Sequence, residues 1–302
     1  MPKSFIAHSS KDKKRYVDIV VKHIGYNRCI YDELTFEEGM KTLEEIEKWL
    51  DKTDLFVIFI SDSALNSDWV KLELVKASYL LKKKLIKRIY PIIIDSNITH
   101  KDPRIPEWMR NEYIIKPISR PSLAAKRIIR RLKEISWDFH PRLKERKKIF
   151  VGRNELINQF EERIHSLDLQ TVTCIIASGF TKIGRKTLLK YGLIKTNDID
   201  LSYEPSVIEL NTHESIEDFI YKVYDLGFSE KINLTDFLSI PVIDKEKIAI
   251  KLIYDIQKSR EILFINDRGC IVTPEGKINN WFRKILEELL NSNRITFCIA
   301  SS

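Results

Sequence analysis

The sequence predicts an α/β protein in which two successive domains each carry a parallel β-sheet. Apolar runs of strand length alternate with amphipathic segments of helix length along the chain. Such alternation is typical of parallel sheets that helices cover on both faces. A basic run at residues 142–148 interrupts the alternation near the middle of the chain. The length of 302 residues also exceeds what one domain usually needs.

The first half of the chain contains five apolar segments that we expect to form strands. They are residues 4–7, 28–31, 55–60, 88–94 and 113–115. The segments between them carry apolar residues at helical spacing and predict helices over 13–24, 41–50, 67–81 and 121–135. In the first of these helices, Tyr16, Ile19, Val20 and Ile24 are expected to face the core. Pro121 suits the first turn of the last one. We therefore expect one domain over residues 1–137.

The second half repeats the alternation after a break. The segment 138–148 contains Pro141 and the basic run, and we expect it to be a solvated linker. A second domain is expected over residues 149–302, with 227–243 irregular. Its strands are predicted at 171–177, 207–210, 262–265 and 295–299. Its helices are predicted at 155–164, 186–194, 214–224, 245–257 and 281–290. Because a sheet rarely ends a domain directly after a strand, we expect this domain to continue beyond residue 302.

Composition excludes several classes of protein. The chain has no run of about 18 apolar residues, so no membrane-spanning helix is predicted. It also has no basic-then-apolar signal peptide at its start. The four cysteines are scattered without metal-ligand spacing, and the six histidines do not cluster with cysteines or acids. We expect reduced cysteines, no metal site and a cytoplasmic protein. The net charge of +8 is spread over lysine-rich helices and permits nucleic-acid contact without indicating it.

The segment 66–77 follows the strand 55–60 and holds the first candidate site. Ser67 is a plausible N-cap, and Asp68 suits the positive end of the helix. Val70, Leu74, Ala77 and Leu81 repeat at helical spacing and should face the core.

Trp69 and Glu73 lie four residues apart, on one face at the edge of that apolar stripe. On spacing alone, Glu73 is an ordinary solvated glutamate and Trp69 a packing residue. Their place after the carboxyl end of a strand changes this interpretation, because open α/β sheets keep their ligand crevice there.

Four segments of the first domain, taken in order, resemble the TIR domain. They are residues 5–12, 32–39, 55–61 and 67–74. The resemblance implies a flavodoxin-like, five-stranded parallel sheet. It also implies hydrolysis of NAD⁺ at the nicotinamide–ribose bond, with no further cofactor. The family's W-x-x-x-E-L pattern falls on Trp69, Glu73 and Leu74, so the resemblance makes Glu73 the catalytic residue.

The same resemblance places further residues at the substrate. His8, Ser9 and Ser10 would help to line the pocket together with Trp69. Asp32 begins a loop, extending to Gly39, that would lie over the pocket and contact a neighbouring TIR domain. Two alternatives stay open: His8 and Asp32 as residues that form hydrogen bonds within their loops, and Ser9 and Ser10 as caps of the next helix.

One carboxylate suffices for this chemistry. Hydrolysis of an ordinary O-glycoside usually needs two, because the leaving alkoxide must be protonated. Nicotinamide leaves as a neutral pyridine, so only the positive charge on the ribose needs stabilisation. TIR domains also occur as adaptors without enzyme activity, and a non-enzymatic signalling scaffold is therefore the alternative.

The second domain resembles the P-loop NTPase domain of STAND-type signalling ATPases. Residues 150–155 match the motif that precedes the family's core, and Gly179 and Gly184 match its phosphate loop. The loop continues with Arg185, Lys186 and Thr187, where a strict P-loop has Lys followed by Ser or Thr. In the second motif, Asn266 stands in place of the Mg²⁺-linked aspartate and Asp267 follows it. Binding of ATP or ADP stays open, and efficient hydrolysis is not expected.

These features together predict an antiviral-defence or cell-death effector of prokaryotic type. In this hypothesis the second domain holds the TIR domain inactive until a trigger, a phage protein or a nucleic acid, drives self-association through the TIR domains. Such activation is a population shift, so the trigger must bind the two states with different affinity.

Overall fold

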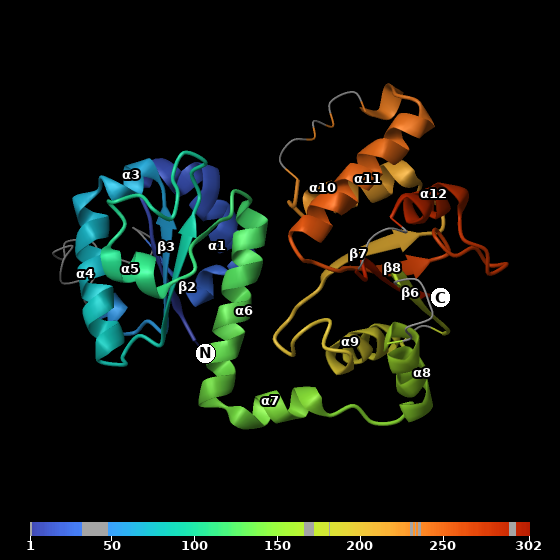
Figure 1. Cartoon of the computed structure of the whole chain (residues 1–302), viewed down its shortest axis with the longest axis horizontal. Coiled ribbons are helices and arrows are strands. Elements are labelled where there is room, and N and C mark those ends of the chain that lie inside the picture. Colours follow the sequence, from blue (N-terminus) through green and yellow to red (C-terminus); the bar gives the residue numbers. More distant parts are fainter. Residues whose placement is uncertain are drawn as a thin grey trace. The chain divides into compact units, whose positions relative to one another are not determined.

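The computed structural model describes residues 2–31, 48–165, 172–180, 182–229, 232, 234, 237–289 and 294–302. The chain divides into two compact units, Met1–Glu145 and Arg146–Ser302. Each unit is an α/β domain with its own parallel sheet (Figure 1).

The sheet of the first unit has five parallel strands in the order β2-β1-β3-β4-β5. Its strands are β1 (Ser4–Ala7), β2 (Cys29–Ile30), β3 (Leu55–Ile60), β4 (Arg88–Ile93) and β5 (Lys116–Pro117). The five-stranded parallel sheet is thus confirmed, in the strand order of flavodoxin-like sheets.

Helices cover both faces of this sheet (Figure 1). They are α1 (Asp18–Ile24), α3 (Asp62–Leu65), α4 (Asp68–Lys82), α5 (Glu107–Glu112) and α6 (Pro121–Phe139). The central strand β3 sends Phe56, Ile58 and Ile60 to the face of α4 and α5. Its alternate residues Leu55, Val57 and Phe59 pack on the face of α1 and α6. A strand that is apolar at every position is expected where both faces are covered.

The start of α1 departs from the predicted helix. Residues Lys13–Val17 form a π-helical turn before the α-helix begins. Tyr16, Val20 and Ile24 are buried as predicted, but Ile19 is 39% exposed, and Val17 is buried instead. A π-turn holds more residues than an α-turn, so it rotates the following side chains away from an ideal helical register.

The last strand of this sheet also lies later in the sequence than predicted. Continuing the observed register from Ile92↔Lys116 would place the predicted strand 113–115 opposite residues 89–91 of β4. Ile93 accepts a hydrogen bond from Ile118 N, so Pro91, two residues earlier, faces the same side. Proline has no N–H for the ladder, and pairing begins only after it. The apolar segment before β5 is therefore loop, and Ile114 is 83% exposed.

The predicted linker is partly helical. The helix α6 ends before His140, close to the predicted break, and α7 (Pro141–Lys148) follows at once. The sequence analysis did not predict a helix in this segment, although Lys, Arg and Leu are good helix formers and proline suits a first helical turn. The prediction of solvation holds for the side chains described in α7, which are all exposed.

The second unit has a parallel sheet of four strands in the order β6-β9-β8-β7. The strands are β6 (Cys174–Ser178), β7 (Ser206–Asn211), β8 (Leu263–Arg268) and β9 (Phe297–Ser301). The helices are α8 (Asn154–His165), α9 (Arg185–Lys195), α10 (Ile216–Asp225), α11 (Val242–Lys258) and α12 (Asn280–Glu288). Side chains of α8 and α9 contribute to one core, and those of α10, α11 and α12 to the other.

Within the described ranges, no helix combines the length and the apolar character that a bilayer crossing requires. The four cysteines, Cys29, Cys174, Cys270 and Cys298, are free thiols.

Candidate functional site

The candidate site of the first unit begins with the anchoring of α4. Ser67 caps this helix, and its Oγ accepts the Val70 N–H at 3.4 Å. Val70 and Leu74 are buried in the core below, as predicted. The cap fixes where the helix starts, and the two apolar side chains fix its rotation. The positions of Trp69 and Glu73 follow from these two constraints.

Glu73 lies in the second turn of α4, at the border between core and solvent. The residue as a whole is half-buried, and its carboxylate oxygen Oε2 is withdrawn from solvent. Trp69, one turn earlier, is 51% exposed. An acid at a core edge beside an exposed aromatic ring offers a charge and a stacking surface to one ligand.

The loop after β1 carries the other predicted residues. His8 Nδ1 lies 2.9 Å from Ile6 O, and because a carbonyl only accepts, the ring donates from Nδ1. The ring centroid of Tyr31 is 6.2 Å from that of His8. Ser9 is buried, and its hydroxyl accepts the Lys11 N–H at 3.4 Å at the start of a 3₁₀ turn. The capping interpretation therefore fits Ser9, whereas Ser10 is exposed.

Topology places these two regions at one edge of the sheet. β1 and β3 are neighbours, with Ala7 opposite Ile58, and both strands run in the same direction. The loop of His8 follows β1, and α3 and α4 follow β3, so both start from the C-terminal edge where such sheets bind ligands. Asp32 lies outside the described residues, and its predicted role stays a prediction.

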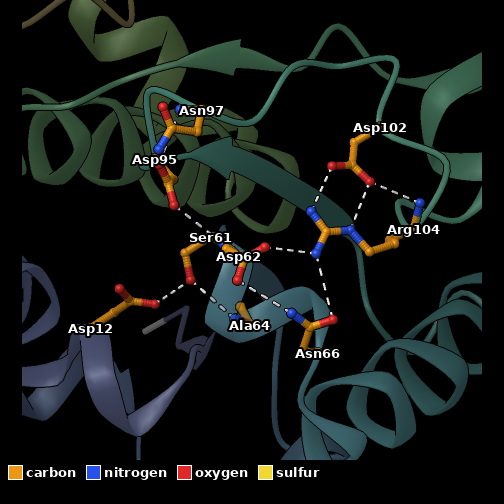
Figure 2. A network of polar contacts seen from close by, with 9 residues as sticks. All are labelled: Asp12, Ser61, Asp62, Ala64, Asn66, Asp95, Asn97, Asp102 and Arg104. Atoms are coloured by element: carbon orange, nitrogen blue, oxygen red, sulfur yellow. Dashed lines mark hydrogen bonds and ion pairs between the residues drawn. The ribbon is translucent and has the colours of Figure 1, made fainter.

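A polar network at the same edge was missed by the sequence analysis (Figure 2). Asp12 is only 1% exposed, and its Oδ2 accepts the Ser61 hydroxyl at 2.5 Å. Ser61 in turn accepts the Ala64 N–H at 3.0 Å and so caps α3. Arg15 donates to the other oxygen of Asp12 at 2.7 Å. Asp12 thus ties the loop after β1 to the helix after β3.

The network continues to the loop after β4 (Figure 2). Arg104 bridges Asp62 and Asp102, with an N–O distance of 2.8 Å to each. Its hydrogen bonds lower the pKa of the Asp102 carboxyl below the usual value. Asp95 accepts the backbone N–H of Asp62 at 3.4 Å. These contacts cross-link the loops after β3 and β4. The sequence indicated them only by the polar residues that follow each strand.

The second unit has a strand–loop–helix arrangement at the predicted nucleotide site. The loop after β6 bends at Gly179 and Gly184, which both have positive φ. Arg185 donates hydrogen bonds to the carbonyl oxygens of Gly179 and Ser301. Lys186 and Thr187 are exposed in the first turn of α9. The guanidinium of Arg185 is thus engaged with backbone at the ends of β6 and β9.

Asp267, at the end of β8, is also engaged with its own domain. Its Oδ1 accepts the N–H groups of Cys270 and Ile271 at 2.9 and 2.8 Å. Its Oδ2 accepts the Val272 N–H and the Ser301 hydroxyl, each at 3.0 Å. The carboxylate therefore organises the turn after β8. Nucleotide binding by Gly179, Gly184, Arg185, Lys186, Thr187 and Asp267 stays a prediction.

A search of the described ranges for metal sites finds no group of three or more His, Cys, Asp or Glu side chains that could hold an ion.

Comparisons with known proteins agree with the geometry of the first unit. Residues 5–116 match the family of the TIR domain, so this part of the chain is a TIR domain. The match does not extend into Arg146–Ser302, and the second domain remains unidentified. A comparison with curated proteins gives no match.

Among solved structures, the chain is similar to the TIR domains of the activated Roq1 resistosome, which directly recognises the pathogen effector XopQ. The identity is 20% and the TM-score 0.30, over 33% of this chain. The aligned part spans 63% of the length of that chain.

Proposed function

We propose that the TIR domain is an NAD⁺ glycohydrolase and that Glu73 is its catalytic residue. The observation that carries the proposal is the position of this carboxylate within the TIR match: half-buried, with Oε2 withdrawn from solvent, one turn from an exposed tryptophan. A partly desolvated carboxylate interacts more strongly with a developing positive charge than one in bulk water.

The proposed reaction breaks the bond between ribose C1′ and the nicotinamide nitrogen. The bonding electrons leave with nicotinamide, which becomes a neutral pyridine and needs no general acid. Glu73 stabilises the cationic ribose, and water adds to C1′ and loses a proton, giving ADP-ribose. Trp69 would stack on a ring of the dinucleotide. His8, Ser9 and Ser10 would line the pocket from the β1 loop. No cofactor is required for this step.

The second unit would regulate the first. In this proposal Arg146–Ser302 is a STAND-like P-loop domain that keeps the TIR domain inactive until self-association. A trigger such as a phage protein or a nucleic acid would release it. Its order β6-β9-β8-β7, with a glycine-bounded loop between β6 and α9, supports a P-loop relationship. The engagement of Arg185 and Asp267 with backbone groups favours a structural use of that loop over ATP turnover.

A non-enzymatic TIR scaffold is the second candidate, and one observation favours it. Leu72, Val75 and Tyr79 form an exposed apolar stripe on α4, with exposed fractions of 47, 71 and 48%. Such a stripe on a regular helix suits contact with a protein partner. A scaffold and an enzyme would both use α4, so only a measurement of NAD⁺ cleavage distinguishes the two candidates.

The test is an NAD⁺ assay on the full chain, with nicotinamide measured by chromatography, in dilute solution and under crowding that drives assembly. We expect Glu73→Ala to lower the rate by a factor of about 10² or more, as expected for losing the main electrostatic group. Glu112→Gln, which removes an exposed acid elsewhere in the unit, should leave the rate unchanged. Circular dichroism should show both variants folded.

Undiminished NAD⁺ loss by Glu73→Ala would refute the role of Glu73. A wild-type chain that assembles but releases no nicotinamide would refute the enzyme and leave the scaffold.

A further inference from the structure

The helix α7 has an unusual composition. Five of its eight residues are Lys or Arg, its one acid is Glu145, and its one apolar residue beyond Pro141 is Leu143. Every side chain of α7 that the structure describes is exposed, Leu143 included. A helix that is charged all round gains almost nothing from a core, so its composition calls for another explanation.

The charges have a definite arrangement around the helix. At about 100° per residue, Arg142 and Arg146 share one flank, and Lys144 and Lys148 share a second flank roughly 160° away. Leu143 lies between the flanks on one side, with the position of Lys147 about 40° from it, and Glu145 lies between them on the other side. The helix therefore has two rows of cations, separated on one side by the positions of Leu143 and Lys147 and on the other by Glu145.

This arrangement fits a groove between two rows of phosphates. Eight residues make a helix about 12 Å long and, with side chains, about 10–12 Å wide. The major groove of B-form DNA is about 12 Å wide and admits one α-helix. With the face of Leu143 and Lys147 toward the groove floor, each cation row faces one backbone. Glu145 then points away from the phosphates, where its charge costs least.

The same charges make α7 poorly stable without a counterion. Arg142 with Arg146, and Lys144 with Lys148, are like-charge pairs at four-residue spacing, which destabilise a helix. Phosphates on both flanks would remove that repulsion. A membrane surface fits less well, because interfacial helices bury an apolar face and α7 has only Leu143 for one. The deep, narrow major groove of A-form RNA does not admit side chains in this way.

We propose that α7 binds duplex DNA without sequence preference, with Arg142 and Arg146 on one phosphate backbone and Lys144 and Lys148 on the other. The inference does not depend on NAD⁺ cleavage.

Binding is tested by fluorescence anisotropy of a labelled mixed-sequence DNA duplex titrated with the full chain at several salt concentrations. Four phosphate contacts predict a slope of about −3.6 for log K against log salt. The affinity should therefore fall roughly 150-fold between about 50 and 200 mM salt. The combined variant Arg142→Gln, Lys144→Gln, Arg146→Gln, Lys148→Gln should lose binding at about 100 mM salt and should flatten the slope by about 3 or more.

A matched control removes four charges elsewhere. Lys71, Lys247, Lys258 and Lys277 are all exposed and lie on α4, α11 and the loop before α12. Changing these four to Gln gives the same net charge as the α7 variant, and DNA affinity should stay within about threefold of wild type. Glu145→Gln, which removes the one acid of α7, should not weaken binding.

Several outcomes would overturn the proposal. Equal loss of affinity in both fourfold variants would make binding a property of net charge, not of α7. Binding of duplex RNA as tight as that of DNA would exclude the major-groove geometry. Binding of phosphatidylserine vesicles in place of DNA would make α7 a membrane contact. No DNA binding at about 50 mM salt, with circular dichroism showing a folded chain, would end the proposal.

Discussion

Replacing Asp12 should destabilise the TIR domain far more than its place in a surface loop indicates. The carboxylate is buried, and it accepts the Ser61 hydroxyl at 2.5 Å and two Arg15 N–H groups at 2.7 and 3.1 Å. Arg15 is 60% exposed, so its ion pair should be worth about 1 kcal/mol or less. The contact with Ser61 is buried, and a hydrogen bond to a charged group is worth about 1.5–3 kcal/mol.

The expected values differ among the variants. Asp12→Ala leaves a buried hydroxyl without its acceptor, and we expect it to lower the free energy of unfolding by about 2–3 kcal/mol. Ser61→Ala removes a helix cap as well and should cost about 2 kcal/mol. Arg15→Gln is the matched control and should cost about 0.5 kcal/mol. In the double variant Asp12→Ala, Ser61→Ala, the coupling free energy should be about 1–2 kcal/mol.

Urea unfolding followed by tryptophan fluorescence measures these differences in the full chain. Four of the five tryptophans lie in the first unit, so fluorescence mainly reports the TIR domain. Where the two units unfold in separate steps, each step is fitted by itself. Equal losses for Asp12→Ala and Arg15→Gln, with no coupling to Ser61, would show that the buried hydrogen bond contributes nothing.

Two further predictions concern the second unit. Lys245 is buried, and its hydrogen bond to Glu217 at 2.7 Å lowers the pKa of that glutamate. A lowered pKa stabilises the fold above the pKa of glutamate in the unfolded chain, and the effect is lost as the pH falls through the folded-state pKa. Lys245→Met should thus lower the free energy of unfolding by about 1–2 kcal/mol near neutral pH and by less in acid. Urea unfolding at both pH values measures the two losses, and equal losses would contradict this cause. Gly192→Ala should lower the free energy of unfolding by about 1 kcal/mol, because the new Cβ would lie 2.9 Å from the Phe160 ring. Alanine by itself favours helices, so a raised melting temperature would show that the ring moves aside.

The strands that the sequence predicts best are those that are fully buried in the sheet. β1 and β3 occur at their predicted bounds: β3 is a continuous apolar run between polar residues, and β1 is Ser4 followed by three apolar residues before the polar loop of His8. The prediction fails where one residue changes the pairing or the turn. Pro91 moves the start of β5, and the π-turn before α1 rotates Ile19 outward. Hydrophobic periodicity records neither a missing N–H nor an extra residue in one turn.

In the candidate site too, some side chains are positioned by local sequence and others by contacts between distant residues. Ser67 and the apolar stripe of α4 place Glu73, and both are local patterns that a sequence displays. Asp12 and Ser61 are 49 residues apart, and each alone looks like an ordinary loop residue. Only the parallel pairing of β1 with β3 brings them into contact. The loop of His8 is therefore positioned against α3 by a bond that spacing could not reveal. If the proposed enzyme is active, loss of that bond should misplace the β1 loop while leaving Glu73 on its own anchored helix, so Ser61→Ala should raise the KM for NAD⁺ more than it lowers kcat.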